Sequence, residues 1–219
     1  MRRIRRERFH GRLTGVGLLA ALCTLFLVAE VSAETITAEY DIFAVYATVW
    51  AQPFEAGRRY AQTFTAEQSG TLLSIALVVD RDLANNPTEI PLTVQLQSLS
   101  AGLPSDTVLA SGSIAPTDPQ FDQYYLSWKT VSIDAYPIVV GQTYAVVASA
   151  LGTDEAYNWY SKQHGGSAYT GGAMCVYSGT WAAQADDLGF RVNIDPIPEP
   201  ATLSLVALGG LALLRRRRR

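Results

Sequence analysis

The chain has 219 residues, with 17 basic and 20 acidic side chains and a formal net charge of −3. Eleven of the basic residues are arginines in two terminal clusters, at residues 2–12 and 215–219. The intervening residues 34–200 hold six basic and 18 acidic side chains, a formal charge of −12, which excludes a nucleic-acid-binding domain that meets phosphates with cations. The length fits one domain of ordinary size.

Residues 1–33 predict a secretory signal peptide that forms a helix. Arginines through Arg12 make a positive first region, residues 16–28 make an apolar run, and Val31-Ser32-Ala33 supplies the small residues that signal peptidase accepts. We expect signal peptidase to cleave between Ala33 and Glu34. The alternative is an uncleaved membrane anchor, for which the apolar run is short against a span of about 20 residues.

Residues 34–195 are predicted to form the exported domain, because apolar and polar side chains alternate there with a period of two and no convincing amphipathic helix is found. We expect strands at residues 40–50, 60–66, 70–79, 92–97, 108–114, 124–133, 143–150, 156–161, 172–177 and 188–194. Turn-rich segments at 82–87 and 101–106 separate some of them. The pattern predicts an all-β fold, an antiparallel two-sheet β-sandwich of jelly-roll type.

The segment at residues 70–79 is apolar on both faces and is therefore predicted to be a central strand. Simple alternation divides its side chains into two sets, with Leu73, Ile75, Leu77 and Val79 on one face and Leu72, Ala76 and Val78 on the other.

Several short motifs follow one another in an order that resembles that of the exported "choice-of-anchor" β-sandwich domains. The motifs are Gln62-Thr63-Phe64-Thr65-Ala66, Leu92-Thr93-Val94-Gln95-Leu96, Gly102-Leu103-Pro104, Gly141-Gln142-Thr143-Tyr144, Asn158-Trp159-Tyr160 and Asp187-Leu188-Gly189-Phe190-Arg191-Val192. The resemblance implies a jelly-roll module without a known activity, and it supplies no catalytic residues.

Catalytic chemistry finds little support, and we predict neither an enzyme nor a cofactor. His164 is the only histidine after the signal peptide, and no Gly-x-Ser-x-Gly elbow accompanies it, so we interpret it as a solvated loop residue. A glycosidase needs two carboxyl groups that converge on one bond. Neighbouring residues on a strand face opposite ways, so the acid pairs Asp154–Glu155 and Asp186–Asp187 would not converge. A hydrolase is therefore the weakest alternative.

Metal binding is weakly indicated at one place and otherwise not expected. Asp80 and Asp82, with two asparagines after them, could supply oxygen ligands to Ca²⁺, but a solvated turn is favoured because the full calcium loop is missing. Cys175 is the only cysteine after the signal peptide and is expected to be a buried, inert thiol.

Aromatic residues suggest the main alternative function, a carbohydrate-binding module for exopolysaccharide. Tyr157 and Trp159 would share one strand face, and Tyr169 and Trp181 are expected in loops that could flank a shallow groove. Exposed rings would stack on the flat faces of sugars. The interpretation that we favour is that Trp159, Tyr144 and Phe190 fill the core and that the tyrosines are ordinary strand residues.

Residues 196–219 form a distinct terminal segment. Pro196, Pro198 and Pro200 favour an extended chain, and residues 201–214 are uncharged and predict a transmembrane helix. Its rise of about 21 Å is short of a ~30 Å hydrocarbon core, but flanking arginines can snorkel. The basic tail should stay on the cytoplasmic side and hold the domain outside the inner membrane; it consists of Arg215, Arg216, Arg217, Arg218 and Arg219.

The Pro198-Glu199-Pro200 motif, the short apolar helix and the arginine cluster together resemble the PEP-CTERM sorting signal of Gram-negative bacteria. The resemblance implies that a membrane-embedded exosortase recognises Pro198, Glu199 and Pro200 and processes the protein nearby. A plain tail anchor with a proline linker is the alternative. We therefore expect an exported, non-enzymatic cell-surface or extracellular-matrix protein that is held transiently in the inner membrane.

Overall fold

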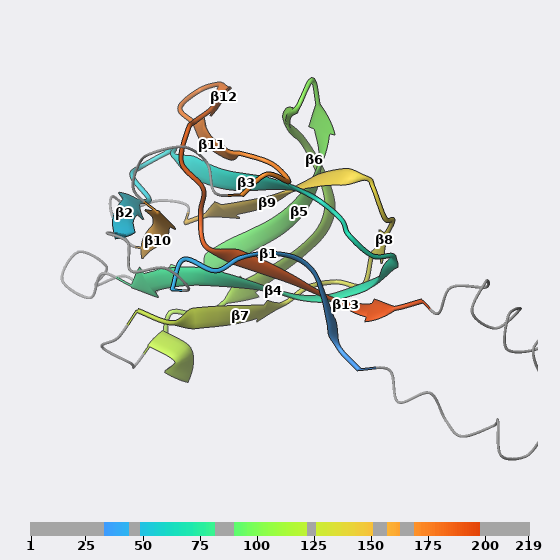
Figure 1. The fold of residues 1–219 in the computed structure, drawn as a ribbon. Helices are drawn as coiled ribbons and strands as arrows, with labels where there is room; N and C mark the ends of the chain where they lie inside the picture. Colours follow the sequence, from blue (N-terminus) through green and yellow to red (C-terminus); the bar gives the residue numbers. More distant parts are fainter. Residues whose placement is uncertain are drawn as a thin grey trace, which may run out of the picture. The chain divides into compact units, whose positions relative to one another are not determined.

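The computed structural model describes residues 33–43, 49–81, 90–121, 126–150, 157–162 and 169–197, all within the unit formed by residues 33–219. These ranges contain a short 3₁₀ helix, Pro119–Phe121, and strands that we label in chain order (Figure 1). The strands are β1 (Thr35–Tyr40), β2 (Val49–Pro53), β3 (Arg59–Thr65), β4 (Gly70–Arg81), β5 (Leu92–Ser100), β6 (Leu103–Ile114), β7 (Trp128–Ser132), β8 (Pro137–Ile138), β9 (Thr143–Ser149), β10 (Tyr157–Lys162), β11 (Met174–Tyr177), β12 (Trp181–Ala183) and β13 (Phe190–Pro196).

The first sheet is organised around β4. Its strands follow the order β1-β13-β4-β10-β2, and β7 and β8 also pair with β4. All these pairings are antiparallel, and β4 meets β13 from Gly70 to Leu77 and β10 from Val79 to Arg81. The prediction of a central strand at residues 70–79 is confirmed, since β4 has hydrogen-bonded neighbours on both edges.

The second sheet has the order β12-β11-β3-β9-β5-β6, again with antiparallel pairing throughout. Side chains from the inner faces of both sheets form one core; Phe64 of β3, for example, lies with its ring centroid 5.9 Å from that of Phe190 on β13. Burying one large apolar side chain contributes about 1.5–3 kcal/mol. The predicted alternation turns many such side chains toward the core, and their burial contributes much of the fold's stability. The largest fully buried side chains of this core are Trp159, Tyr60, Tyr157, Phe54, Phe64 and Phe190.

The fold is thus all-β, with two antiparallel sheets in the arrangement of a β-sandwich, as predicted. The jelly-roll type stays a prediction. The predicted signal helix and the helix at 201–214 lie outside the described residues.

The predicted strand at residues 40–50 is wrong at its start. β1 ends at Tyr40, and the chain then turns, because the Asp41 carboxylate Oδ1 accepts a hydrogen bond from the Phe43 backbone N–H at 2.8 Å. This local bond competes with the ladder of a strand and ends it. The turn brings Ile42, which is 1% exposed, against Val78 and Gly189 on the outer face of the first sheet, where a glycine leaves room for it.

Strand β4 contains a bulge that reverses two predicted side-chain directions. Its register with β13 shifts, so that Ser74 pairs with Asn193 but Leu72 with Ile194, which leaves Leu73 without an opposite residue. Leu73 is therefore 41% exposed, while Leu72 is 1% exposed and lies in the core beside Ile75. Simple alternation assigned these two leucines to the wrong faces, because a bulge inserts one residue into the period of two.

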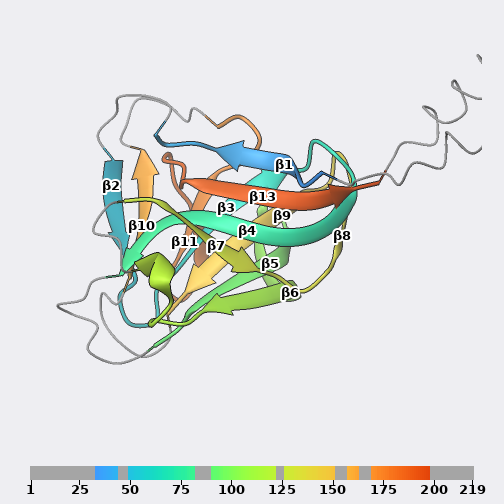
Figure 2. The ribbon, with the colours of Figure 1, turned by 90° about the horizontal axis from the view of Figure 1, so that it is seen from below.

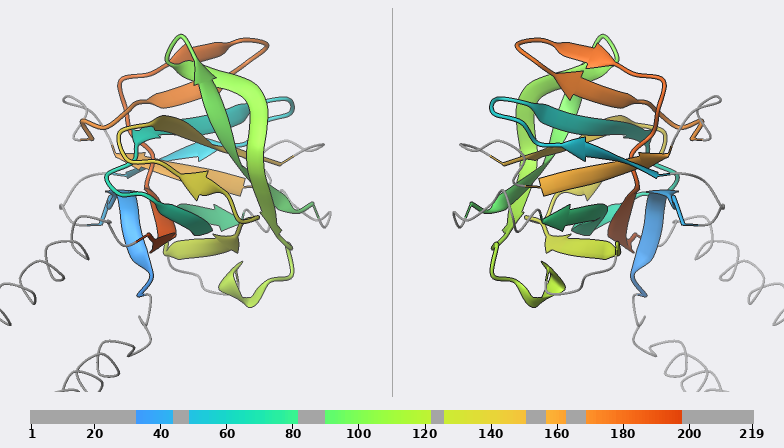
Figure 3. Two further views of the ribbon diagram at one scale, coloured as in Figure 1. Left: turned by 90° about the vertical axis from the view of Figure 1, so that its right-hand side faces the viewer. Right: turned by 90° about the vertical axis from the view of Figure 1, so that its left-hand side faces the viewer.

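The predicted turn at residues 101–106 is shorter than expected. Only Ala101 and Gly102 form it, both with positive φ, and β6 begins at Leu103. The hairpin of β5 and β6 curves toward β11 and β12 (Figure 3). Its tip covers a second apolar cluster on the outer face of the second sheet, where Leu99 and Leu103 pack on Ala61, Ala145, Val147 and Cys175.

Candidate sorting and processing site

The predicted signal-peptidase bond lies directly before the first strand. Ala33 and Glu34 are both exposed, and Thr35 opens β1 by pairing with Ile194 of β13. The Glu34 carboxylate accepts a hydrogen bond from the Ser74 hydroxyl at 3.2 Å, and the Thr35 hydroxyl donates to the Ala33 carbonyl at 3.1 Å. Cleavage between Ala33 and Glu34 would therefore leave every pair of β1 in place.

The C-terminal exit lies directly after the last strand. Pro196 ends β13 and pairs with Gly70 of β4, and the Ile197 N–H donates to the Ser69 carbonyl at 3.1 Å. The next residue is Pro198, so among the described residues the chain bonds to the sandwich up to the residue before the predicted sorting motif. Pro198, Glu199, Pro200 and the basic tail lie outside the described residues.

Gly70 is required for this exit. A Cβ at this position would lie 2.4 Å from the Asp195 carbonyl oxygen and 2.8 Å from Ile194 Cδ1, so any side chain would displace the end of β13. Strand β13 is also an inner strand, lying between β1 and β4. The last strand before the sorting motif is thus an integral part of the first sheet.

The predicted signal-peptidase bond and the C-terminal exit at Ile197 lie at the same end of the sandwich. β1 and β13 are antiparallel neighbours, so the start of one strand lies beside the finish of the other, about 5 Å apart between paired Cα atoms. Figures 1 and 2 show the start of β1 and the end of β13 on the right, together with β8. A segment on either side of the domain therefore leaves it from one end.

Two of the four aromatic residues predicted to bind carbohydrate are core residues instead. Tyr157 and Trp159 share one face of β10, as expected, but both are 0% exposed. The Trp159 Nε1–H donates to the Gly189 carbonyl at 2.8 Å, and the Tyr157 hydroxyl donates to the Ile90 carbonyl at 2.6 Å. Because the face turned toward the second sheet is covered, neither ring can stack on a sugar.

Tyr169 is half-buried in ring contacts. Its ring packs 5.2 Å from that of Phe190 and 6.1 Å from that of Tyr40, and its backbone N–H donates to Asp187 Oδ2 at 3.3 Å. Burial, with a smaller contribution from Glu67, raises the pKa of Tyr169 to about 12. The ring thus serves as a cover for the core at this edge.

Trp181 keeps partial exposure but begins β12 and is not in a loop, contrary to the prediction. Its ring lies 5.3 Å from that of Tyr177, and the Arg59 guanidinium sits 3.8 Å from the centre of the Tyr177 ring. Asp106 accepts hydrogen bonds from Arg59 at 2.8 Å and from the Trp181 Nε1–H at 3.3 Å. We call these four side chains the Trp181 cluster.

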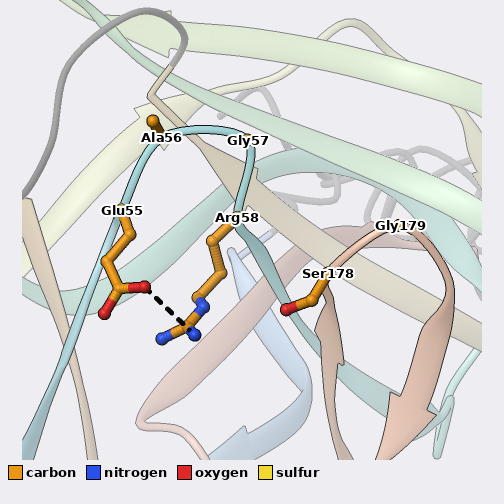
Figure 4. A pocket seen from close by; sticks show the side chains of 6 residues that line it. All are labelled: Glu55, Ala56, Gly57, Arg58, Ser178 and Gly179. Carbon is orange, nitrogen blue, oxygen red and sulfur yellow. Dashed lines mark ion pairs between the residues drawn. The ribbon is translucent and has the colours of Figure 1, made fainter.

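A hollow of about 420 Å³ lies next to the Trp181 cluster (Figure 4). Ser178 and Gly179 line one wall of this hollow, and they belong to the turn between Tyr177 and Trp181. Its opposite wall is the turn that precedes Arg59, where Glu55 and Arg58 form an ion pair at 3.1 Å. Figure 4 shows the Ser178 side chain pointing toward that ion pair. Sequence analysis found only Trp181 here, since pairing between distant strands assembles the other residues.

The weak calcium prediction gains nothing from the structure. Asp80 Oδ1 accepts a hydrogen bond from the Asn158 amide at 3.0 Å and Oδ2 accepts one from the Tyr160 hydroxyl at 2.5 Å, so its oxygens already have partners. Asp82 lies outside the described residues, as does His164. Within the described part of the chain, no group of three or more His, Cys, Asp or Glu side chains is placed to hold a metal ion.

Cys175 is a buried free thiol, as expected, at 1% exposure under the β5–β6 hairpin. Burial raises the pKa of the thiol from 9.0 to about 11. Thiolate is the reactive form, so the native protein holds this sulfur in its unreactive state at neutral pH.

The raised pKa values predict a loss of stability in alkali. As the pH rises above about 9, Cys175 ionises in the unfolded chain but stays protonated in the folded one, so its contribution is full below pH 9 and is lost by about pH 11. Urea unfolding at pH 7, 9 and 11 should show a fall of about 1–3 kcal/mol from this group. Cys175→Ala should show a shallower fall, and an identical pH dependence in both proteins would contradict the assignment.

Comparison with known families agrees with the geometry at the exit. A family model described as the PEP-CTERM protein-sorting motif matches residues 196–219, which begin at the last residue of β13. No curated protein matches the chain. In the part of the chain that the structure describes, no helix is long and apolar enough to cross a bilayer. The resemblance predicted for the C-terminal segment is confirmed.

Proposed function

Because the chain carries a PEP-CTERM protein-sorting motif, the mark of an exported protein sorted by exosortase, we propose that it is a non-enzymatic cell-surface or extracellular-matrix protein. Signal peptidase would remove residues 1–33, the C-terminal segment would hold the domain outside the inner membrane, and an exosortase-like enzyme would then process the chain near Pro198, Glu199 and Pro200. The observation that carries the proposal is the match at 196–219, which begins at the last residue of an inner strand.

The chemistry of the described residues supports a role without catalysis. The buried carboxylate of Asp187 accepts hydrogen bonds from the Gln62 amide at 3.1 Å and from the Tyr169 backbone N–H, so it works as a structural acceptor. The Cys175 thiol is covered and protonated. The formal charge of −12 over residues 34–200 favours solubility outside the cell and repels polyanionic partners.

The experiment that tests this function determines the covalent ends of the exported chain. Loss of the N-terminal segment together with the arginine tail is expected, because each segment serves only to deliver the domain. An exported chain that keeps its arginine tail would contradict processing by an exosortase.

A second candidate function is carbohydrate binding at the Trp181 cluster. It is supported by a partly exposed tryptophan beside a hollow lined by Glu55, Arg58 and Ser178, whose polar groups could bond to sugar hydroxyls. On an exopolysaccharide and glycan array, saturable binding that Trp181→Ala abolishes would support it. Trp50→Ala is the matched control, because Trp50 is 51% exposed but lies on β2 of the other sheet. Equal binding by both variants would exclude the cluster.

A further inference from the structure

Three exposed aliphatic side chains gather at the end from which the sorting segment leaves. Val139, Val140 and Ile197 are 48%, 52% and 58% exposed. The Ile197 N–H donates to the Ser69 carbonyl at 3.1 Å, and the Val140 N–H donates to the Ser69 hydroxyl at 2.9 Å. Ser69 therefore bonds to both Ile197 and Val140, and Val139 precedes Val140 in the chain. We call Val139, Val140 and Ile197 the exit patch.

The sheet register places the exit patch on adjacent strands. Gly70 of β4 pairs with Pro196 on one side and with Ile138 on the other, so the ends of β13 and β8 are two strand spacings apart, about 10 Å. Ile197 and Val139 each follow those pairs by one residue. Figures 1 and 2 both show β8 beside the end of β13.

The turn that carries the two valines is built firmly and exposes them. The Gln142 N–H donates to the Val139 carbonyl at 3.1 Å, and Gly141 has a φ of +77°, which is typical of the third position of a type II turn. The Val139 N–H also donates to the Tyr144 hydroxyl at 3.2 Å. Polar residues usually occupy exposed turns, so two stiff apolar side chains here call for an apolar neighbour.

The length of chain beyond the patch identifies that neighbour. Three residues separate Ile197 from Ala201, the start of the uncharged segment 201–214, and the four steps from one Cα atom to the next span at most about 14 Å. Whenever that segment lies in a bilayer, the exit patch is held within this distance of the point of entry. We propose that Val139, Val140 and Ile197 rest in the lipid interface and orient the domain while the chain is membrane-held; this rests on the function proposed above.

The contact can be weak and still be occupied. A short tether keeps the patch at an effective concentration of order millimolar with respect to the membrane, so three aliphatic side chains need not bind lipid from free solution. Glu67, exposed near Ser69, opposes anionic headgroups, so the apolar side chains and the tether must supply the attraction. After processing removes the tether, the patch should release the bilayer.

The test uses the full chain in phosphatidylcholine vesicles with a lipid-sensitive probe. Cys23→Ser and Cys175→Ala remove the native thiols, and Val140→Cys receives an environment-sensitive fluorophore. Ser178→Cys is the control: it is exposed in a tight turn beside Arg59, at the opposite end of β3 from the Ala66–Gln142 hydrogen bond. The length of β3 separates the two ends by about 20 Å. Thermal unfolding of both labelled proteins checks that the fold is kept.

Fluorescence at position 140 is expected to shift to the blue and to be quenched severalfold by brominated lipids, while position 178 stays unquenched. Adding Val139→Asn should reduce the quenching at 140. Equal quenching at both positions, or a blue shift at 140 without lipid quenching, as a second protein copy would produce, would overturn the proposal alone. A chain that does not float with the vesicles would overturn the membrane-held state and this proposal together.

Discussion

Replacing Pro198, Glu199 and Pro200 by alanine is expected to leave the chain unprocessed and retained in the inner membrane. A site built to hydrogen-bond a polar substrate group rejects an analogue that lacks the group by roughly 10⁴-fold, so we expect loss of the Glu199 carboxylate to be enough to stop cleavage. The two prolines restrict this segment to extended conformations. Without them the segment loses more conformational entropy when it binds the enzyme, which weakens binding further. Membrane fractionation followed by immunoblotting measures the retained form.

The matched control replaces an exposed proline and an exposed glutamate that belong to the sandwich. Pro91 and Glu67 are both exposed, so Pro91→Ala with Glu67→Ala changes the same residue types outside the motif. This control should be processed like the unchanged chain. Normal processing of the triple alanine variant would show that the C-terminal segment is only an anchor with a proline linker.

Trp159→Ala is expected to lower the free energy of unfolding by about 3–5 kcal/mol, the largest effect of any single change proposed for the sandwich. Trp159 is 0% exposed, pairs with Val79 on one side and Gln52 on the other, and holds the Gly189 carbonyl through its indole N–H. Its removal would open a cavity between the sheets that rigid strands cannot close. Urea unfolding followed by fluorescence of the remaining tryptophans measures the change.

Trp50 supplies the control for this prediction. It lies on β2, the strand next to β10, but is 51% exposed, so Trp50→Ala should change the free energy of unfolding by about 0.5 kcal/mol or less. Equal destabilisation by the two variants would contradict the assignment of Trp159 to the core. A glycan-binding role for Trp159 would instead predict lost binding with unchanged stability.

Local sequence patterns predicted much of the sandwich because the same pattern decides which face of a strand is buried. Leu92, Val94 and Leu96 of β5 alternate in the sequence, and all three are 0% exposed. The rule failed at Leu73, where the partner strand imposes a bulge that is not encoded by the alternation of β4 itself. Short strands such as β8 and β12 escaped prediction, because two or three residues are too few to show a period.

Of the candidate sites, the one formed by consecutive residues could be predicted from the sequence, and the one assembled from distant residues could not. The sorting motif could be predicted because proline, glutamate, apolar run and arginine cluster follow one another within 24 residues. The Trp181 cluster could not, since Asp106 is 47 positions from Arg59 and 75 from Trp181. Sequence spacing also cannot tell a covered ring from an exposed one: Tyr157 and Trp159 share a strand face as predicted, but the second sheet covers that face and leaves both rings 0% exposed.

Intact-mass measurement on the protein recovered from the cell envelope and medium tests the central claim most directly. If the chain is exported and processed on both the N-terminal and the C-terminal side of the domain, its mass should correspond to a product that begins at Glu34 and ends close to Pro198, Glu199 and Pro200, without the five terminal arginines. A mass that includes residues 201–219, in protein found outside the inner membrane, would contradict the account.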